Sequence, residues 1–245
     1  MFSRTYGYIL GHPATRRGYW GIWYYKDRYK KVVDKLLKLC DKKTMTILDC
    51  GCGSGIYARY LEEKGCLCHY VGCDINATSL KSAYHGQSTE YVLCDIQRLP
   101  FRDGSAEVVL CSEVLEHLAS SYKTLAAVSK TVVTALVVTF PEERILTAFR
   151  DRHPEHVSQI DKDRVIGLLR SMSFEVVESS RIFSSFIPCG ILEFLGIPRN
   201  TLTEKLVRYF DNLLRRLIPS VLVPHKTILV EARQVQAGGP GPSKT

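Results

Sequence analysis

The sequence lacks the features that would place the protein in a membrane or in a secreted, disulfide-bonded class. No run of 18 or more apolar residues occurs among its 245 residues, so no membrane-spanning helix is predicted. The first 20 residues mix aromatic side chains with arginine and contain no apolar core of a signal peptide. With 45% hydrophobic and 24% charged residues, the composition is that of a globular protein, and we expect it in the cytoplasm.

The sequence also lacks the cysteine spacing that is typical of zinc sites. The nine cysteines are an odd number, and Cys50/Cys52 and Cys66/Cys68 are each separated by one residue instead of the two that zinc sites usually show. The first of these pairs lies within a glycine-rich loop. We therefore expect reduced thiols, most of them acting as small buried hydrophobic side chains.

Excess charge is absent from most of the chain. Residues 44–245 contain 22 basic and 22 acidic residues, whereas residues 1–43 contain 11 basic and 3 acidic residues and carry the whole net charge of +8. Tyrosine and tryptophan side chains are interleaved with these basic residues. Such a segment could meet an acidic substrate, nucleic acid or lipid headgroups. The alternative is a solvated helix whose aromatic side chains fold over an active site, and we interpret residues 1–43 as a basic aromatic lid and helix.

Predicted strands and helices alternate from residue 44 to residue 235, after a first helix from about Tyr24 to Leu39. This alternation predicts a single α/β domain built on a mostly parallel sheet with helices on both faces. The strands are predicted at Met45–Cys50, Leu67–Asp74, Glu90–Cys94, Glu107–Cys111, Ala135–Phe140, Phe174–Ser179 and Thr227–Ala232. The helices between them are predicted at Ile56–Lys64, Ala77–Tyr84, Glu113–Leu118, Thr124–Val132 and Asp161–Ser171.

A hydrophobic insertion interrupts the domain at residues 186–224. From Leu202 to Leu217 its apolar residues recur at helical spacing, which predicts a helical cap over the substrate or, alternatively, a helix lying on a membrane surface. Residues 236–245 are rich in Gly and Pro and are predicted to be a disordered tail.

A glycine-rich loop, Asp49 to Gly55, follows the first predicted strand. Gly51, Gly53 and Gly55 allow a sharp turn and the close approach of a ligand, and the helix after them directs its amide groups toward the same crevice. Dinucleotide sites use similar loops. However, the carboxylate of Asp49 would repel a pyrophosphate, whereas it could receive the ammonium of a methionine moiety directly or through water. Its other possible role is to cap the helix.

Acidic residues also end the next two predicted strands. Asp74 follows the glycine loop at a spacing that suits acceptance of both hydroxyls of a ribose, a feature that NAD sites share. Asp95 could accept from an adenine amino group while Ile96 packs on the ring. Three carboxylates at successive strand ends, without a phosphate-binding lysine, favour a cationic nucleoside and leave a dehydrogenase as the weaker alternative.

Four stretches together resemble a known family: the LDCGCGSG loop, VGCDIN, CDIQRLPF and EVVLCSEVLEHL. They resemble the class I S-adenosylmethionine-dependent methyltransferases of the type 11 group, which includes ubiquinone- and menaquinone-pathway enzymes, over Thr46–Phe140. The resemblance implies a Rossmann-like sheet of seven strands whose last strand is antiparallel. One departure is that SKTVVTALVV replaces the usual Lys-Pro-Gly-Gly turn before the fifth strand. The cofactor residues that it implies are Asp49, Gly51, Gly53, Gly55, Asp74, Ile75, Asp95, Ile96 and Ser112.

The first candidate catalytic group is Glu113, Glu116 and His117. On a helix, these side chains would share one face and could hold Mg²⁺ or Mn²⁺, which would lower the pKa of an acceptor hydroxyl. The pattern resembles the metal-binding residues of small-RNA 2′-O-methyltransferases and of ubiquinone-pathway O-methyltransferases. In the alternative without metal, Glu113 contacts the cofactor or substrate, Glu116 is structural, and His117 lines the pocket.

Histidines supply the second candidate group. His153 and His156 follow the fifth predicted strand, where loops reach the active site, and His156 could be a general base or a further metal ligand. A packing or capping role is the alternative for both histidines. His12, in the basic N-terminal segment, is a weaker candidate.

The function predicted from these features is methyl transfer to oxygen or carbon of a small or lipid-like acceptor. The apolar insertion favours that acceptor and would allow peripheral contact with a membrane. The first alternative is a metal-assisted RNA 2′-O-methyltransferase that uses Glu113, Glu116 and His117, although no RNA-binding module is recognisable. The second is a domain that binds cofactor or a partner without catalysis.

Overall fold

The computed structural model describes residues 21–40, 45–142, 157–183 and 226–235, together with Leu206, Tyr209, Phe210 and Leu213. Predictions for His12, His153 and His156, for the tail at residues 236–245, and for most of the insertion at residues 186–224 lie outside these residues. The four described residues of the insertion are helical and have exposed side chains.

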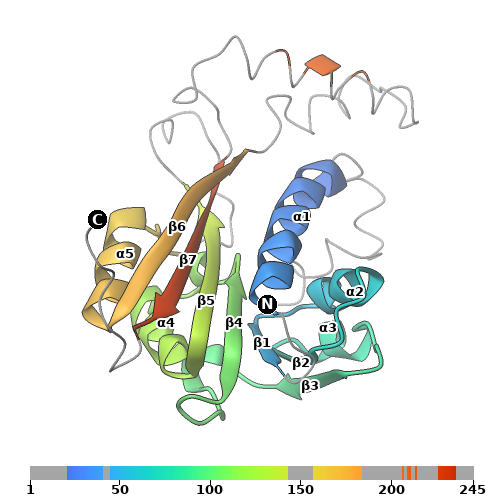
Figure 1. Cartoon of the computed structure of the whole chain (residues 1–245), viewed down its shortest axis with the longest axis horizontal. Coiled ribbons are helices and arrows are strands. Elements are labelled where there is room, and N and C mark those ends of the chain that lie inside the picture. Colours follow the sequence, from blue (N-terminus) through green and yellow to red (C-terminus); the bar gives the residue numbers. More distant parts are fainter. Residues whose placement is uncertain are drawn as a thin grey trace, which may run out of the picture.

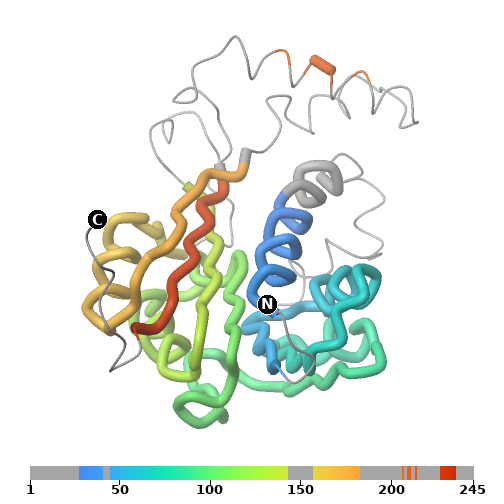
Figure 2. The backbone as a smooth tube through the Cα atoms, viewed as in Figure 1, coloured from blue at the N-terminus to red at the C-terminus, as the bar shows by residue number. Residues whose placement is uncertain are grey.

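Seven strands form one sheet in the order β3-β2-β1-β4-β5-β7-β6 (Figure 1). All pairings from β3 to β5 are parallel, and β7 is antiparallel to both of its neighbours, as the family resemblance implied. Figure 2 shows β7 running between β5 and β6. The strands are β1 Thr46–Cys50, β2 His69–Asp74, β3 Thr89–Leu93, β4 Ala106–Ser112, β5 Val132–Pro141, β6 Phe174–Phe183 and β7 Lys226–Gln234.

Helices cover both faces of the sheet, with α1 and α2 on one face and α4 and α5 on the other (Figure 1). The helices are α1 Gly21–Leu39, α2 Ile56–Glu63, α3 Ala77–Lys81, α4 Ser121–Lys130 and α5 Lys162–Ser171, with short 3₁₀ turns η3 Ile96–Arg98 and η4 Leu115–His117. None of the helices in the described part of the chain is long and apolar enough to cross a membrane.

The core consists of two layers, one on each face of the sheet. Successive residues of β4 point to opposite faces, so that Val108 and Leu110 join the layer under α1 and α2, while Val109 and Cys111 join the layer under α4 and α5. All four side chains are buried, which explains why β4 has no alternation of polar and apolar residues.

The helix predicted at Glu113–Leu118 is absent, and the three-residue turn η4 takes its place. Glu113 has a φ of 56°, and its N–H donates to the carbonyl of Thr139, 2.9 Å away. The residue therefore extends the contact between β4 and β5 in a left-handed conformation, which cannot begin an α-helix. The departure at SKTVVTALVV is also explained, because α4 ends at Lys130 and β5 begins two residues later at Val132.

Candidate active site

The sheet order places a topological switch point between β1 and β4, and we call the space outside the carboxyl ends of these strands the crevice. Successive strands are added toward β3 on one side of β1 and toward β6 on the other, so the order reverses between β1 and β4. In open α/β sheets, ligands bind outside the carboxyl ends of the strands at this point. The glycine loop leaves β1 here, while Ser112 ends the neighbouring strand β4 and Glu113 follows it.

Hydrogen bonds to the end of β2 hold the glycine loop. The N–H groups of Gly51 and Cys52 both donate to the carbonyl of Cys73, at 2.8 and 3.0 Å. Gly51 has a φ of 83°, and a Cβ at this position would lie 2.3 Å from a methyl carbon of Val114. A glycine is therefore needed here for the turn and for its packing against the segment after β4.

Asp74 ties the glycine loop to the second strand–helix unit. One carboxylate oxygen accepts from the N–H of Gly53 and the other from the N–H of Asn76, each at 2.8 Å. The side chain is 2% exposed, and burial raises its pKa although these hydrogen bonds act in the opposite direction. The contacts seen in the structure thus position the loop, a role that the sequence prediction of ribose binding did not include.

Asp49 lies beneath the loop and is 1% exposed. The hydroxyl of Tyr70 donates to its carboxylate, and burial raises its pKa to about 7. The negative charge of Asp74 adds to this increase in the pKa of Asp49. Because the Asp49 carboxylate is so deeply buried, an interaction with a ligand ammonium through water or through long-range electrostatics fits it better than a direct contact.

Ile75, just after β2, has an exposed apolar side chain. It is 58% exposed, whereas Ile96 is 5% exposed and belongs to the core. Ile96 packs into the core in this structure, so its contact with an adenine ring stays a prediction, whereas Ile75 and Leu93 offer exposed apolar surface. Asp95 caps η3 through a hydrogen bond from the N–H of Gln97, 2.9 Å from one of its oxygens.

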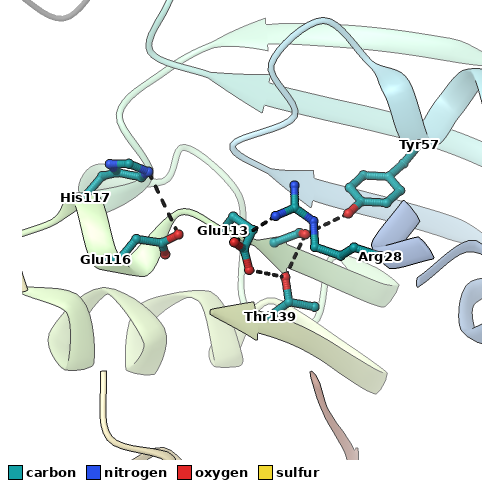
Figure 3. Close-up of polar contacts among 7 residues, drawn as sticks. Arg28, Tyr57, Glu113, Glu116, His117 and Thr139 are labelled. Atoms are coloured by element: carbon teal, nitrogen blue, oxygen red, sulfur yellow. Dashed lines mark hydrogen bonds and ion pairs between the residues drawn. The ribbon is translucent and has the colours of Figure 1, made fainter. Parts of the chain in front are cut away.

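A chain of polar contacts crosses the carboxyl ends of β4 and β5 (Figure 3). The Tyr57 hydroxyl lies 2.8 Å from the Ser112 hydroxyl, which lies 2.8 Å from that of Thr139. Thr139 donates to Glu113 at 3.2 Å, and Glu113 pairs with the Arg28 guanidinium at 2.8 Å. Because each hydroxyl has one hydrogen, Thr139 accepts from Ser112 and Ser112 accepts from Tyr57. All the donors therefore point toward Glu113.

The ion pair links α1 to the site. Arg28 is 4% exposed, and its charge lies over the aromatic ring of Tyr29 as well as against Glu113. A buried charge requires a partner of opposite sign, so this contact determines how α1 packs beside β4. Glu113 is held by a cation and a hydroxyl, which suits a positioning role rather than the catalytic role predicted from the sequence.

The predicted metal site does not form among Glu113, Glu116 and His117. Glu113 faces Arg28, while the Glu116 carboxylate lies 3.9 Å from Nε2 of His117 on η4 (Figure 3). The prediction assumed a helix that would align the three side chains, and that helix is absent. Within the described ranges, no three or more His, Cys, Asp and Glu residues are arranged to hold a metal ion.

Sequence reasoning missed Arg28, Tyr57, Tyr70 and Thr139. A signal existed for Arg28, because it precedes Val32 by four residues and Leu36 by eight, and so lies on the apolar face of α1. A charged residue on such a face predicts a buried partner. The hydroxyl groups gave no comparable signal, since nothing in the spacing of Tyr57, Ser112 and Thr139 brings them together.

Residues 48–134 match the model of a protein family described as a methyltransferase domain. An uncharacterised methyltransferase of Mycolicibacterium gilvum is 32% identical over 84 residues, which are 33% of this chain and 32% of the relative. The chain spans about a third of the length of the first curated relatives that it matches.

Two further relatives are named as methyltransferases of RNA. The 18S rRNA (guanine-N(7))-methyltransferase bud23 of Schizosaccharomyces pombe is 35% identical over 37% of this chain and 35% of its own. The tRNA (carboxymethyluridine(34)-5-O)-methyltransferase alkbh8 of Xenopus tropicalis is 28% identical over 53% of this chain and 18% of its own.

Solved structures share the fold over most of the chain. Magnesium protoporphyrin IX methyltransferase of Synechocystis, with S-adenosylmethionine bound, has a TM-score of 0.58 and 14% identity over 86% of this chain and 80% of its own. A methyltransferase of Archaeoglobus fulgidus has a TM-score of 0.56 and 20% identity over 88% and 100% of the respective chains. The [4+2]-cyclase SpnF has a TM-score of 0.61 and 15% identity, over 85% and 81%.

The sheet order, the glycine loop at the strand switch and the family match together define a class I methyltransferase fold. Residues 48–134 match the methyltransferase-domain family, and the solved structures that share the fold include methyltransferases that use S-adenosylmethionine. The ubiquinone-pathway subgroup remains a prediction from the resemblance.

Proposed function

We propose that the protein transfers a methyl group from S-adenosylmethionine to oxygen or carbon of a small or lipid-like acceptor. The observation that carries the cofactor part is the glycine loop held by Asp74 at the crevice between β1 and β4. When bound there, S-adenosylmethionine supplies an electrophilic methyl group.

The loop and its neighbours fit such a cofactor. The buried carboxylate of Asp49 favours a positively charged ligand over a pyrophosphate. Asp95 remains partly exposed and Ile75 is exposed, so these side chains can meet an adenine amino group and the face of its ring. We propose Asp74 as the residue that shapes the loop for the ribose, with Ser112 closing the crevice from β4.

Catalysis in this site would depend mainly on position. Methyl transfer is an in-line displacement, and a nucleophile held in line gains most of its rate from orientation. The Arg28–Glu113 pair holds α1 beside the crevice. The hydroxyls of Tyr57, Ser112 and Thr139 form a chain of hydrogen bonds in which each donates toward Glu113. His117 is the proposed base where the acceptor must lose a proton.

The apolar acceptor is supported by the insertion. Leu206, Tyr209, Phe210 and Leu213 have exposed side chains, and the Tyr209 and Phe210 rings contact each other edge to face. One of the solved structures that share the fold is a magnesium protoporphyrin IX methyltransferase. We propose that the insertion contributes to acceptor selection.

The decisive experiment is transfer of labelled methyl from S-adenosylmethionine into lipids, small metabolites, RNA and protein fractionated from cells. Label in the lipid or small-molecule fraction is the expected result. The fold also occurs in the [4+2]-cyclase SpnF, so the fold alone does not establish methyl transfer. Binding of the cofactor without transfer of label to any fraction would therefore overturn the proposed reaction. Calorimetry with Asp74→Ala, checked for folding by circular dichroism, tests the cofactor site separately, and unchanged affinity would contradict it.

A second candidate acceptor is RNA, because bud23 and alkbh8 are matched over part of the chain and residues 1–43 are basic. This candidate does not require Glu113, Glu116 and His117 to bind metal. It predicts RNA binding that weakens steeply with salt, and a much smaller slope after residues 1–20 are removed. Salt-independent binding, or an unchanged slope in the truncated protein, would reject this candidate.

A further inference from the structure

Three cysteine thiols gather at the opposite end of the sheet from the crevice, where the strands begin. Cys40 follows the last residue of α1, Cys66 lies in the turn after α2, and Cys68 directly precedes β2. The Sγ atoms of Cys66 and Cys68 are 3.2 Å apart, and Cys40 packs against the same hydrophobic cluster as these two cysteines. No sequence motif joins Cys40 to the other two, because the cluster depends on how α1 packs against α2.

Local backbone structure positions each thiol. Gly65 has a φ of 77° and ends α2, and the N–H of Cys66 then donates to the carbonyl of Leu61 at 2.9 Å. The N–H of Cys40 continues the pattern of α1 by donating to the carbonyl of Leu36 at 2.8 Å. The thiols therefore meet on ordered backbone.

The cluster can be reached by a small molecule. Cys66 and Cys68 line a cavity of about 20 Å³ together with Leu61, Glu62, Gln87 and Thr89. This volume exceeds what one water molecule needs, so a hydrogen peroxide molecule could approach the two sulfurs. Cys66 is partly exposed, whereas Cys68 is buried.

The electrostatic environment favours Cys66 as the reactive thiol. Hydrogen bonding with Cys40 and Cys68 lowers the pKa of Cys66, although burial acts in the opposite direction. A thiolate is the nucleophile in oxidation by peroxides, and low-pKa thiols with a neighbouring thiol are typical of redox-sensitive sites. The described residues include no metal-holding group of three or more His, Cys, Asp and Glu, which favours thiol chemistry over a thiolate metal site.

We propose that Cys40, Cys66 and Cys68 form a peroxide-sensitive thiol site, in which Cys66 is oxidised and Cys40 resolves it to a disulfide. The Cys66 thiolate attacks one oxygen of hydrogen peroxide and becomes a sulfenic acid, and the other oxygen leaves as hydroxide. The Cys40 thiol then attacks the sulfenic sulfur, and water leaves. The two thiols lose two electrons in total, and the peroxide is reduced to two molecules of water.

Cys68 supports this reaction as a hydrogen-bonding neighbour of Cys66 rather than as its partner in the disulfide. A bridge between Cys66 and Cys68 would close a ring with only one residue between them, which strains the disulfide geometry. A bridge to Cys40 joins the end of α1 to the approach to β2. The proposal is independent of methyl transfer.

Treatment of the reduced full-length protein with one equivalent of hydrogen peroxide tests the site. We expect two fewer titratable thiols than the nine in the sequence, restored by dithiothreitol. Under non-reducing conditions, mass spectrometry of the tryptic digest should show residues 39–42 linked to residues 65–81 through Cys40 and Cys66. Absence of this linked peptide, with oxidation spread over the other cysteines, would overturn the proposal.

Two variants separate the roles. In Cys40→Ser, the sulfenic acid at Cys66 should persist and be trapped by dimedone, while Cys66→Ser should lose the linked peptide. A cross-link from Cys40 to Cys68 at the wild-type rate in Cys66→Ser would contradict the assignment of the reactive thiol. Cys94→Ser, which removes a partly exposed cysteine outside the cluster, is the matched control and should cross-link as the wild type does.

Discussion

Two buried carboxylates beside the glycine loop have different environments. Asp74 accepts two backbone hydrogen bonds, whereas Asp49 accepts from Tyr70 beneath the loop. Burial raises the pKa of Asp49 to about 7, although the hydrogen bond from Tyr70 acts in the opposite direction.

Replacing Asp49 by Asn should flatten the pH dependence of stability. The ordinary pKa of 3.8 rises to about 7 on folding, so the folded state binds more protons between these values, and the free energy of unfolding falls as pH rises toward 7. The slope from this group approaches about 1.4 kcal/mol per pH unit. Urea unfolding from pH 4 to 8 should show this fall in the wild type and a smaller fall in Asp49→Asn.

The control for this prediction is Asp95→Asn, which changes a partly exposed carboxylate at the end of the neighbouring strand. Equal slopes in the wild type and Asp49→Asn would show that Asp49 does not titrate in this range.

Replacing only one partner of the Arg28–Glu113 ion pair should lower the free energy of unfolding more than replacing both partners. Arg28→Met leaves the Glu113 carboxylate without its cation, and we expect a loss of about 3 kcal/mol in the free energy of unfolding. Adding Glu113→Gln should restore part of this loss, because no uncompensated charge is then buried. A double-mutant cycle from chemical unfolding measures the coupling, and strictly additive effects would contradict the contact.

At the scale of elements, most of the fold could be predicted because each strand and helix has a local pattern. Strand β4 was recognisable from Val108-Val109-Leu110 alone, since a fully apolar run fits a strand buried on both faces. The turn η4 was mistaken for a helix because Glu113, Glu116 and His117 have helical spacing. The left-handed Glu113 that prevents the helix depends on β5, which local spacing does not contain.

The candidate site divides in the same way. The glycine loop and the strand-end carboxylates were found because they are consecutive within single strand–loop–helix units. The contacts of Arg28, Tyr57 and Thr139 required the packing of helices and strands that are distant in sequence. A residue beside a strand end can lie in the core or at the surface, as the buried Ile96 and the exposed Ile75 show, and local spacing does not distinguish the two.

Helix α1 is also attached to the far half of the sheet. The Lys35 ammonium lies 2.5 Å from Glu178 on β6 and 2.6 Å from Glu231 on β7, and Glu231 is buried. Lys35→Met should lower the free energy of unfolding by about 2 kcal/mol, because the buried carboxylate loses a cation. Lys38→Met, at an exposed position of the same helix, is the matched control. Equal effects of the two variants on the unfolding midpoint would contradict the role of Lys35.

For the whole molecule, cofactor binding should raise the melting temperature. A ligand at 100 times its dissociation constant stabilises the folded state by about 2.7 kcal/mol, which corresponds to a shift of roughly 5 to 10 °C for a domain of this size. We expect this shift with S-adenosylhomocysteine in differential scanning fluorimetry and none with NAD. A shift of similar size with NAD alone would favour the dehydrogenase alternative.

Strand β7 has a consequence for how the protein is made. It pairs with β5 on one side and β6 on the other, although residues 184–225 separate β6 from β7 in the sequence (Figure 2). A ribosome therefore releases β1 to β5 well before the strand that covers the outer side of β5 exists. During that interval, the backbone groups and apolar side chains at this edge can pair with another nascent chain. Brief protection of this edge by a chaperone should therefore raise the yield of folded protein, and slow synthesis of residues 184–225 should lower it. Neither should change the stability of the folded protein.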